Sequence, residues 1–356
     1  MKFNKQKIRN PNNIYIIDIV DHLVPMFNLS SVARALYAPT LIETRRLLYF
    51  FILFIGYVLL FQLPDAAQGG SPYIIQTIIF FFKIIFFLIS INQVDFKKEN
   101  KNLNKVITII LLVNIGLSAV GIGYTQYGYS SSGLPYGVKG VYKGGNELSI
   151  TYLIFVILAP INRLSHSLLL AIMGLAFATK VALLGAVYVL AKALIARMTI
   201  NRIILAAFII IPVIALLLSN YIEFQSERWS DNVRKSVGLV NLILSGRDDK
   251  LAYALQSHDA TFTSILIGHG FYTYQYLTPN YREFFVEIDT VDLFLSGGLV
   301  GVCLVYIPLL YKLYMAIIKK ELKWAIALFA MLGLSTTSGH VIYNSLLPLL
   351  LISYRK

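Results

Sequence analysis

Residues 47–63 read LLYFFILFIGYVLLFQL, an uncharged apolar run at the start of a chain of 356 residues. A helix needs roughly 20 apolar residues to cross a 30 Å hydrocarbon core, and about 17 suffice. This segment therefore predicts a membrane-spanning helix, and it is the reference for the other apolar runs of the chain.

The overall composition agrees with a membrane protein. Hydrophobic residues make up 57% of the chain and charged residues only 14%, whereas a soluble domain carries roughly 25% charged residues. The hydrophobicity also excludes an intrinsically disordered chain. The single cysteine, Cys303, excludes an intramolecular disulfide and a CxxC metal or redox site. We therefore expect an all-α polytopic integral membrane protein.

The apolar runs divide the chain into ten expected spans. Residues 164–196 are too long for one span, because 33 residues of helix would reach about 50 Å, so we expect two short helices that meet at a turn around Lys180. The expected spans are 47–63, 72–94, 106–123, 148–161, two within 164–196, 203–219, 293–318, 322–338 and 341–354.

The charges orient these spans. The net charge is +13, and with both termini in the cytoplasm about two thirds of the Lys and Arg residues fall on cytoplasmic segments, as the positive-inside rule requires. No nucleic-acid-binding motif is present, so the excess of cations predicts no nucleic-acid partner. In residues 14–37, Asp18, Asp21 and His22 interrupt an apolar pattern, which favours an interfacial or re-entrant helix over a span.

We expect three regions that form one integrated domain: a membrane bundle over 1–219, a large extracytoplasmic loop over 220–290 that carries short helices, and C-terminal membrane helices over 291–356. A loop as long as the second region is usually functional. The charge bias predicts that this loop lies on the outer side of the membrane.

Two cations are candidates for anion binding. Lys180 lies in an apolar stretch, where it either faces a cavity or extends its ammonium to water at the outer interface. Arg247 follows a Ser-Gly turn, and its guanidinium matches phosphate oxygens; an ordinary Arg–Asp pair at the start of a surface helix is the alternative. Lys83, within an apolar run, is better explained by a structural role.

Two histidines lie next to glycines. GHG at 268–270 indicates a tight turn around His269, which is as compatible with a loop corner as with a ligand site. Ser338-Gly339-His340 joins the last two spans, and His340 is either a structural hydrogen-bonding group or part of the site.

The strongest local group is FFVEIDTVDLFLSGGLVGVCLVY at 284–306. Asp289 and Asp292 share a face if the segment is helical, and Glu287 precedes them. Acids in the first turn favour the helix dipole; the functional alternative is a general base that accepts the proton of a hydroxyl. The glycines at 297, 298 and 301 allow another helix to approach closely.

These motifs, in this order, resemble the bacterial O-antigen ligase/polymerase superfamily, in particular the Wzy-type polysaccharide polymerases. The resemblance covers about 139–345. It consists of KGVYKGGNELS (139–149), ATKVALLG (178–185), SGR (245–247), GHG (268–270), the acid-plus-glycine helix start at 287–301 and SGH (338–340). Many ligases carry a His-Asn pair where this chain has Glu287, and many members have Arg where it has Lys180.

The resemblance implies a metal-independent glycosyltransferase without a cofactor, located in the bacterial cytoplasmic membrane with its active site on the outer side. The donor would be a growing glycan on undecaprenyl pyrophosphate, and the acceptor a lipid-linked repeat unit; the other implied partners are membrane lipids, a chain-length regulator and a flippase. Fixed cations stabilise the leaving diphosphate. The expected catalytic residues are Glu287 or Asp289 as the base, His340 as the second choice, and Asp292 as an anchor of the helix or of a cationic group of the site. The expected substrate-binding residues are Lys180, Arg247, His269, Lys139 and Asn146.

Two other functions stay open. A ligase that transfers finished polymer to another acceptor is the close alternative within enzymes. A flippase of lipid-linked oligosaccharides is the non-enzymatic one, although it predicts two related halves with broken helices, and no such symmetry is evident in the sequence.

Overall fold

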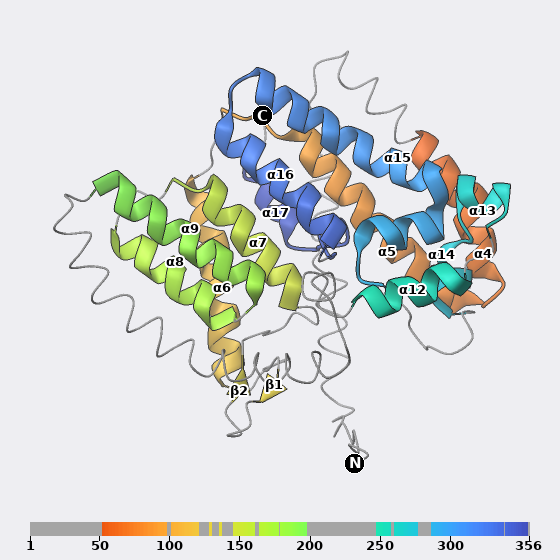
Figure 1. The fold of residues 1–356 in the computed structure, drawn as a ribbon, viewed down its shortest axis with the longest axis horizontal. Coiled ribbons are helices and arrows are strands. Elements are labelled where there is room, and N and C mark those ends of the chain that lie inside the picture. Colours follow the sequence, from red (N-terminus) through yellow and green to blue (C-terminus); the bar gives the residue numbers. More distant parts are fainter. Residues whose placement is uncertain are drawn as a thin grey trace.

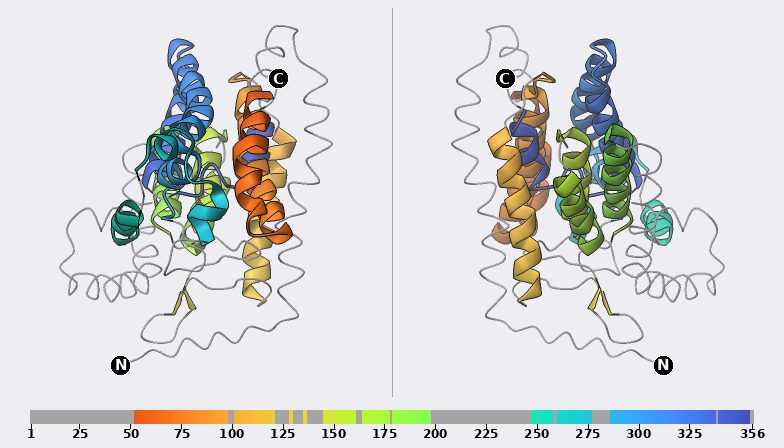
Figure 2. Two further views of the ribbon diagram at one scale, coloured as in Figure 1. Left: turned by 90° about the vertical axis from the view of Figure 1, so that its right-hand side faces the viewer. Right: turned by 90° about the vertical axis from the view of Figure 1, so that its left-hand side faces the viewer.

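A computed structural model gives the arrangement of the chain (Figures 1 and 2). It describes residues 52–97, 101–120, 128–129, 135–136, 145–160, 164–177, 179–197, 247–257, 260–276, 286–337 and 339–354. The expected span at 203–219, the segment 14–37 and Lys139 lie outside these ranges.

The described chain is mostly helical. One antiparallel pair of two-residue strands, β1 (Gly128–Tyr129) and β2 (Pro135–Tyr136), is the exception. A helical run over Ile52–Ala67 contains a π-helical turn, η1 (Val58–Gln62), and ends in α4 (Leu63–Ala67). The other helices are α5 (Ser71–Gln93), α6 (Lys101–Ala119), α7 (Gly145–Leu158), α8 (Leu164–Phe177), α9 (Lys180–Arg197), α12 (Arg247–Ser257), α13 (Phe262–Ile267), α14 (Phe271–Tyr276), α15 (Asp289–Ile318), α16 (Leu322–Thr337) and α17 (Leu347–Ile352).

Two of the described helices, α5 and α15, are long and apolar enough to cross a membrane. Shorter apolar helices cover Ile52–Ala67, Lys105–Ser118, Asn146–Leu158, Ser165–Phe177 and Leu322–Thr337. The count of ten spans therefore stays a prediction. The short helices expected within 220–290 are present as α12, α13 and α14.

The expected division of 164–196 is confirmed. Helix α8 ends at Phe177 and α9 begins at Lys180; the Thr179 hydroxyl accepts the N–H of Ala182 at 3.0 Å and so caps α9. Tyr152 of α7 packs into both helices, because a Cβ at Gly174 or Gly185 would lie 2.6 Å from its side chain. Glycine at these two positions lets α8 and α9 close around one aromatic ring.

Several long-range contacts define one end of the molecule. Lys312 Nζ donates to the Asn92 carbonyl at 2.7 Å, and the Asp95 N–H donates to the Tyr354 carbonyl at 2.8 Å. The Lys319 ammonium lies 5.7 Å from the centre of the Phe96 ring. The C-terminal ends of α5 and α15 and the end of the described chain therefore meet, and the N-terminal ends of α5 and α15 lie at the opposite end (Figure 1).

The expected last span, 341–354, is wrong in its first half. Only Leu347–Ile352 is α-helical, about 9 Å of helix at 1.5 Å per residue, and residues 339–346 form an irregular turn. The Asn344 side chain stabilises this turn, since its Oδ1 accepts the N–H groups of Leu346 and Leu347, both at 2.9 Å. Its Nδ2 donates to the Glu147 carbonyl at 2.8 Å and ties the turn to the start of α7.

Helix α15 is broken at Gly298, which has φ 61° and ψ −165°. The turn after α13 fits against this break: the His269 N–H donates to the Leu295 carbonyl and the Gly270 N–H to the Ser296 carbonyl, both at 3.0 Å. A Cβ at Gly298 would lie 2.5 Å from backbone atoms of 266–268. The close approach expected at the glycines of α15 is thus made by the end of α13 and the GHG turn.

Two side chains of the helical run over Ile52–Ala67 donate hydrogen bonds to carbonyls at the break. Tyr57 Oη donates to the Gly297 carbonyl at 3.0 Å, and Gln62 Nε2 donates to the Ser296 carbonyl at 3.1 Å. Gln62 Oε1 also accepts the Phe271 N–H at 2.9 Å. The carbonyls released by the break are therefore hydrogen-bonded inside protein, which is the condition under which irregular backbone is tolerated at membrane depth.

Candidate functional site

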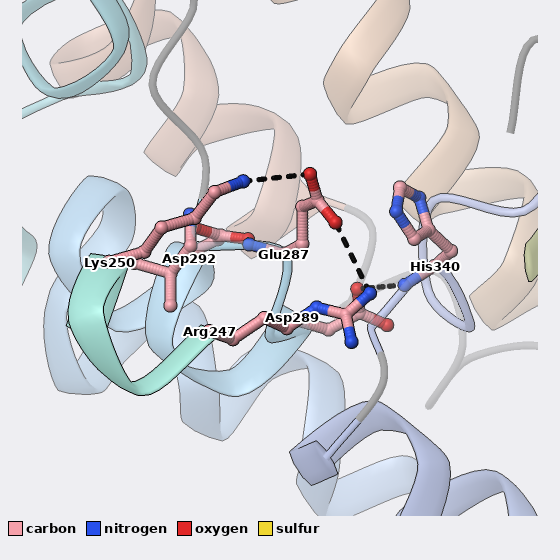
Figure 3. A network of polar contacts seen from close by, with 7 residues as sticks. Arg247, Lys250, Glu287, Asp289, Asp292 and His340 are labelled. Carbon is pink, nitrogen blue, oxygen red and sulfur yellow. Dashed lines mark hydrogen bonds and ion pairs between the residues drawn. The ribbon is translucent and has the colours of Figure 1, made fainter. Parts of the chain in front are cut away.

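Glu287 joins α12 to the start of α15 (Figure 3). Its two carboxylate oxygens pair with two cations of α12: Oε2 with the Arg247 guanidinium at 3.2 Å and Oε1 with the Lys250 ammonium at 2.8 Å. The side chains of Glu287 and Lys250 are 39% and 40% exposed, and that of Arg247 is 10% exposed. The group therefore combines a nearly buried guanidinium with a carboxylate that solvent reaches.

A small apolar cluster holds α12 in this position. Ala254 of α12 and Tyr274 of α14 pack with Val286, Ile288 and Leu295, all buried. This cluster joins α12 and α14 to the first turns of α15. Arg247 and Lys250, three residues apart on α12, therefore present their charges from one face of a fixed helix.

Asp292 fixes the segment that carries Glu287. Its Oδ1 accepts the Val286 N–H at 2.8 Å and the Tyr274 hydroxyl at 2.6 Å, and its Oδ2 accepts the Glu287 N–H at 3.0 Å. Burial, together with the charge of Asp292, raises the pKa of Tyr274 well above its ordinary value, so this phenol stays protonated and donates. The expected role of Asp292 is to anchor the helix or a cationic group of the site; in the structure its carboxylate accepts the backbone N–H groups of the segment just before α15 and the Tyr274 hydroxyl.

Asp289 fixes the turn that carries His340. The carboxylate is 1% exposed and accepts three backbone N–H groups, from His340 at 2.5 Å, Val341 at 2.7 Å and Ile342 at 2.9 Å. Gly339 lies so close that a Cβ there would collide with the Glu287 carbonyl. Both oxygens of Asp289 are thus engaged by backbone donors, a geometry suited to positioning.

His340 completes the cluster. Figure 3 shows its imidazole turned toward the same space as the Glu287 carboxylate, beside the Arg247 guanidinium. Burial lowers the pKa of His340; the negative charge of Glu287 opposes this, and the cations Arg247, Lys83 and Lys250 lower it further. The imidazole is therefore neutral at neutral pH and able to accept a proton.

Opposing effects act on Glu287. Burial raises the pKa of its carboxyl, but the hydrogen bond and charge of Lys250, with the charge of Arg247 and that of His340 when it is protonated, outweigh burial and hold the pKa below its ordinary value. Glu287 is thus ionised at neutral pH and is a weak base while the two cations hold it.

Both proton-accepting candidates have left-handed backbone. Glu287 has φ 65° and His340 has φ 64°, a region that non-glycine residues rarely adopt and that persists where the surroundings fix it. Here Asp292 and Asp289 supply that fixation through their backbone hydrogen bonds. Strain of this kind is concentrated at functional sites.

The remaining predicted residues lie elsewhere in the fold. Asn146 is the second residue of α7 and Lys180 is the first of α9. Lys192 Nζ donates to the Ala159 carbonyl at 3.2 Å, so the two helices run side by side in the same direction. Both residues are consequently at the end of the bundle that meets the 339–346 turn through Glu147. His269 belongs to the turn at the break of α15.

Sequence reasoning missed Lys250 and gave Lys83 a structural role. The spacing of Arg247 and Lys250 in RDDKL would have indicated Lys250, because residues three apart share a helix face. Nothing in the local sequence of Lys83 reports the electrostatic effect on His340, since that effect depends on how α5 packs against the last turn.

The assembled site combines a pair of cations, an accessible carboxylate and a neutral imidazole. Such a set can bind a phosphate-containing group and accept a proton from a neighbouring hydroxyl. Within the ranges that the structure describes, no group of three or more His, Cys, Asp or Glu side chains is placed to hold a metal ion.

Comparison of the chain with protein-family models, with curated proteins and with solved structures finds no match.

Proposed function

We propose that the protein is a polysaccharide repeat-unit polymerase of the Wzy type, which transfers a growing glycan from undecaprenyl pyrophosphate to a lipid-linked repeat unit at the outer face of the bacterial cytoplasmic membrane. One observation carries the proposal. Arg247, Lys250, Glu287 and His340 come from three separate segments and meet at one end of an apolar helical bundle.

The two ends of the bundle support the orientation. Lys97, Lys312, Lys319, Lys320 and Lys323 belong to the end where α5 and α15 finish, opposite the Glu287 cluster. Lysine-rich ends are cytoplasmic under the positive-inside rule. The cluster then faces the extracytoplasmic side, where a lipid-linked substrate arrives after translocation.

The reaction proposed is a single displacement. The acceptor hydroxyl oxygen forms a bond to the anomeric carbon of the donor sugar, and the bond from that carbon to the diphosphate oxygen breaks. The diphosphate lipid leaves with the electron pair, and its negative charge is stabilised by Arg247 and Lys250. Glu287 takes the hydroxyl proton; His340 is the second choice for this base.

The two buried aspartates are positioning residues in this proposal. Asp289 fixes the backbone of His340 and Asp292 fixes that of Glu287. The role of base therefore passes to Glu287 alone among the three acids, because it alone is solvent-accessible and free of backbone donors in the contacts described.

Reconstitution tests the proposal. Purified protein in liposomes that contain lipid-linked repeat units should produce a ladder of lengthened glycans. Repeat units that cross the bilayer without lengthening would identify a flippase, and transfer of polymer to a different acceptor would identify a ligase; either result overturns the proposal.

A matched pair of substitutions locates the reaction. Arg247→Lys should lose most of the elongation rate, because a point charge does not replace the planar fork of the guanidinium. Lys323→Arg, at the opposite end of the bundle, should elongate at the wild-type rate. Normal elongation by a well-folded Arg247→Lys would remove Arg247 from the site.

A further inference from the structure

The Arg247–Glu287–Lys250 contact has the geometry of an occupied anion site. The two cations stand three residues apart on α12, and each pairs with a different oxygen of a single carboxylate, at 3.2 Å and 2.8 Å. A diphosphate offers the same arrangement, oxygens on either side of a central atom, with more negative charge and more acceptor atoms. Charge-assisted bonds to phosphate are among the strongest hydrogen bonds in proteins.

The two sides of this contact are held differently. The cations belong to α12, whose buried Ala254 and half-buried Leu251 and Tyr253 pack in the apolar cluster with α14 and the start of α15. Glu287 lies outside any helix, and its carboxylate is 39% exposed. An incoming anion can therefore displace the carboxylate without moving the helix that carries the cations.

The His340 imidazole lies on the side of the Glu287 carboxylate that faces away from Lys250 (Figure 3). The imidazole and Glu287 act on each other electrostatically, and Figure 3 shows both facing one region. Once it is released from the cations, the Glu287 carboxylate can rotate toward the His340 imidazole.

We propose that Glu287 occupies the place of the donor diphosphate on Arg247 and Lys250, and that binding of a glycosyl diphosphate exchanges the carboxylate for phosphate and frees it to act on the acceptor hydroxyl. This inference rests on the proposed function and adds an order of events to it: the donor binds first, and the base becomes available as a result.

The exchange also strengthens the base. The hydrogen bond and charges that lower the pKa of Glu287 come mainly from Lys250 and Arg247, while burial raises it. When a diphosphate neutralises the two cations, the effect of burial remains and the pKa of Glu287 rises. The carboxylate then accepts the hydroxyl proton more readily, and without a donor it stays a weak base.

Calorimetric binding of inorganic diphosphate to the purified full-length protein, in the presence of a metal chelator, tests the exchange. Glu287→Gln removes the competing charge and should bind diphosphate about fivefold more tightly than the wild type, the magnitude typical of one partly exposed ion pair. Arg247→Ala and Lys250→Ala should each bind it more weakly than the wild type.

Two further variants control for charge and for folding. Glu321→Gln neutralises a carboxylate at the opposite end of α15 and should leave the affinity for diphosphate unchanged. Glu287→Asn serves where Glu287→Gln folds poorly, because asparagine tolerates left-handed backbone better than most residues; it should also bind diphosphate more tightly than the wild type.

A phospholipid headgroup carries related phosphate chemistry, so the binding is measured in nanodiscs with and without phosphatidylglycerol. Unchanged affinity for diphosphate in the two lipids supports a donor site, whereas competition by phosphatidylglycerol that Arg247→Ala abolishes would assign the cations to a headgroup and overturn the exchange.

The remaining outcomes separate this inference from the proposed function. If the wild type elongates lipid-linked units but Glu287→Gln and Glu287→Asn bind diphosphate no more tightly than it does, the exchange is wrong and the function stands. If the wild type neither elongates those units nor binds diphosphate, the proposed function fails and the exchange with it.

Discussion

The two parts of α15 on either side of Gly298 differ in what surrounds them. From Asp289 to Gly298 every residue is buried or half-buried, and the buried set includes Asp289, Asp292 and Ser296. From Leu299 to Ile318 large apolar side chains are exposed, among them Leu299, Ile307, Leu310, Tyr311, Tyr314, Ile317 and Ile318. One helix thus begins inside protein and continues with an open apolar face.

The lengths of these two parts explain the difference. Residues 299–318 make about 30 Å of helix, which matches the hydrocarbon core of a bilayer. The preceding ten residues, 289–298, add roughly 15 Å that would project beyond it. Under the proposed function, the break at Gly298 would lie near the outer boundary of the membrane, with the Glu287 cluster outside it. The first part would then carry the chemistry and the second would anchor it in the bilayer.

The largest loss of stability should follow from adding a side chain at the break in α15. Gly298→Ala places a Cβ 2.5 Å from the backbone of 266–268 at a φ of 61°, and should lower the free energy of unfolding by about 3 kcal/mol or more. The measurement is thermal or denaturant unfolding of the purified protein.

Gly333→Ala on α16 is the matched control, because no neighbouring atom lies within 4 Å of the position that an added Cβ would take; alanine in a helix interior should raise stability by about 0.5–1 kcal/mol. Equal stability of the two variants would mean that the backbone of residues 266–268 does not pack tightly against Gly298.

A smaller loss is expected where Asp289 holds the 340–342 turn. Asp289→Asn retains one acceptor oxygen for three N–H groups, and an unsatisfied buried donor costs about 1–3 kcal/mol, so we expect a loss of about 2 kcal/mol. Elongation should slow mainly through kcat, since His340 loses its fixed position.

Asp95→Asn provides the comparison at the other end, where the carboxylate accepts a single exposed N–H from Lys97. Its stability and elongation rate should stay near those of the wild type. A normal kcat for a folded Asp289→Asn would show that the turn does not depend on Asp289.

The ion pairs of Glu287 should contribute about 1 kcal/mol, as partly exposed pairs do, and in a pH-dependent way. Because the pKa of Glu287 is lower in the folded protein than its ordinary value of 4.5, this contribution is complete above that value and is lost as the pH falls through the folded-state pKa.

Unfolding of the wild type and of Glu287→Gln across pH 3 to 7, roughly the range that spans carboxyl titration, measures the contribution. The stability difference should shrink on the acid side. A difference that is constant with pH would show that the carboxylate is not held by cations.

The smallest perturbation is a label on the only cysteine. Cys303 lies in the second part of α15 and is exposed, so a nitroxide there should contact lipid and collide with oxygen more often than with a water-soluble relaxation agent. The same label on Gln256→Cys in a Cys303→Ser background, on the exposed end of α12, should give the reverse. Water access at Cys303 would contradict the membrane boundary at Gly298.

Local patterns predicted the elements that one segment determines by itself. The apolar runs indicated α5 and α16, the excess length of 164–196 indicated the turn at Lys180, and the acids before the glycines indicated the start of α15. The segment 341–346 was misread as helix because its apolar residues fit a span. Its backbone is instead held by Asp289, about fifty residues away, and no local period reports such a contact.

The sequence predicts most residues of the candidate site but not how they are arranged. Sequence order predicts that Arg247, Glu287, Asp289, Asp292 and His340 lie on one side of the membrane and that Asp292 is an anchor, but it does not distinguish the accessible Glu287 from the buried Asp289. That distinction comes from burial, which depends on how α12, α14 and the last turn pack around α15.

The most direct test compares the two ends of α15. Elongation of lipid-linked repeat units in proteoliposomes is measured for Glu287→Gln, beside the proposed site, and for Glu321→Gln, just after the other end of the helix. Glu287→Gln should elongate about 10²–10⁴-fold more slowly, the usual contribution of a general base, while Glu321→Gln should keep the wild-type rate. Wild-type elongation by a folded Glu287→Gln would contradict it.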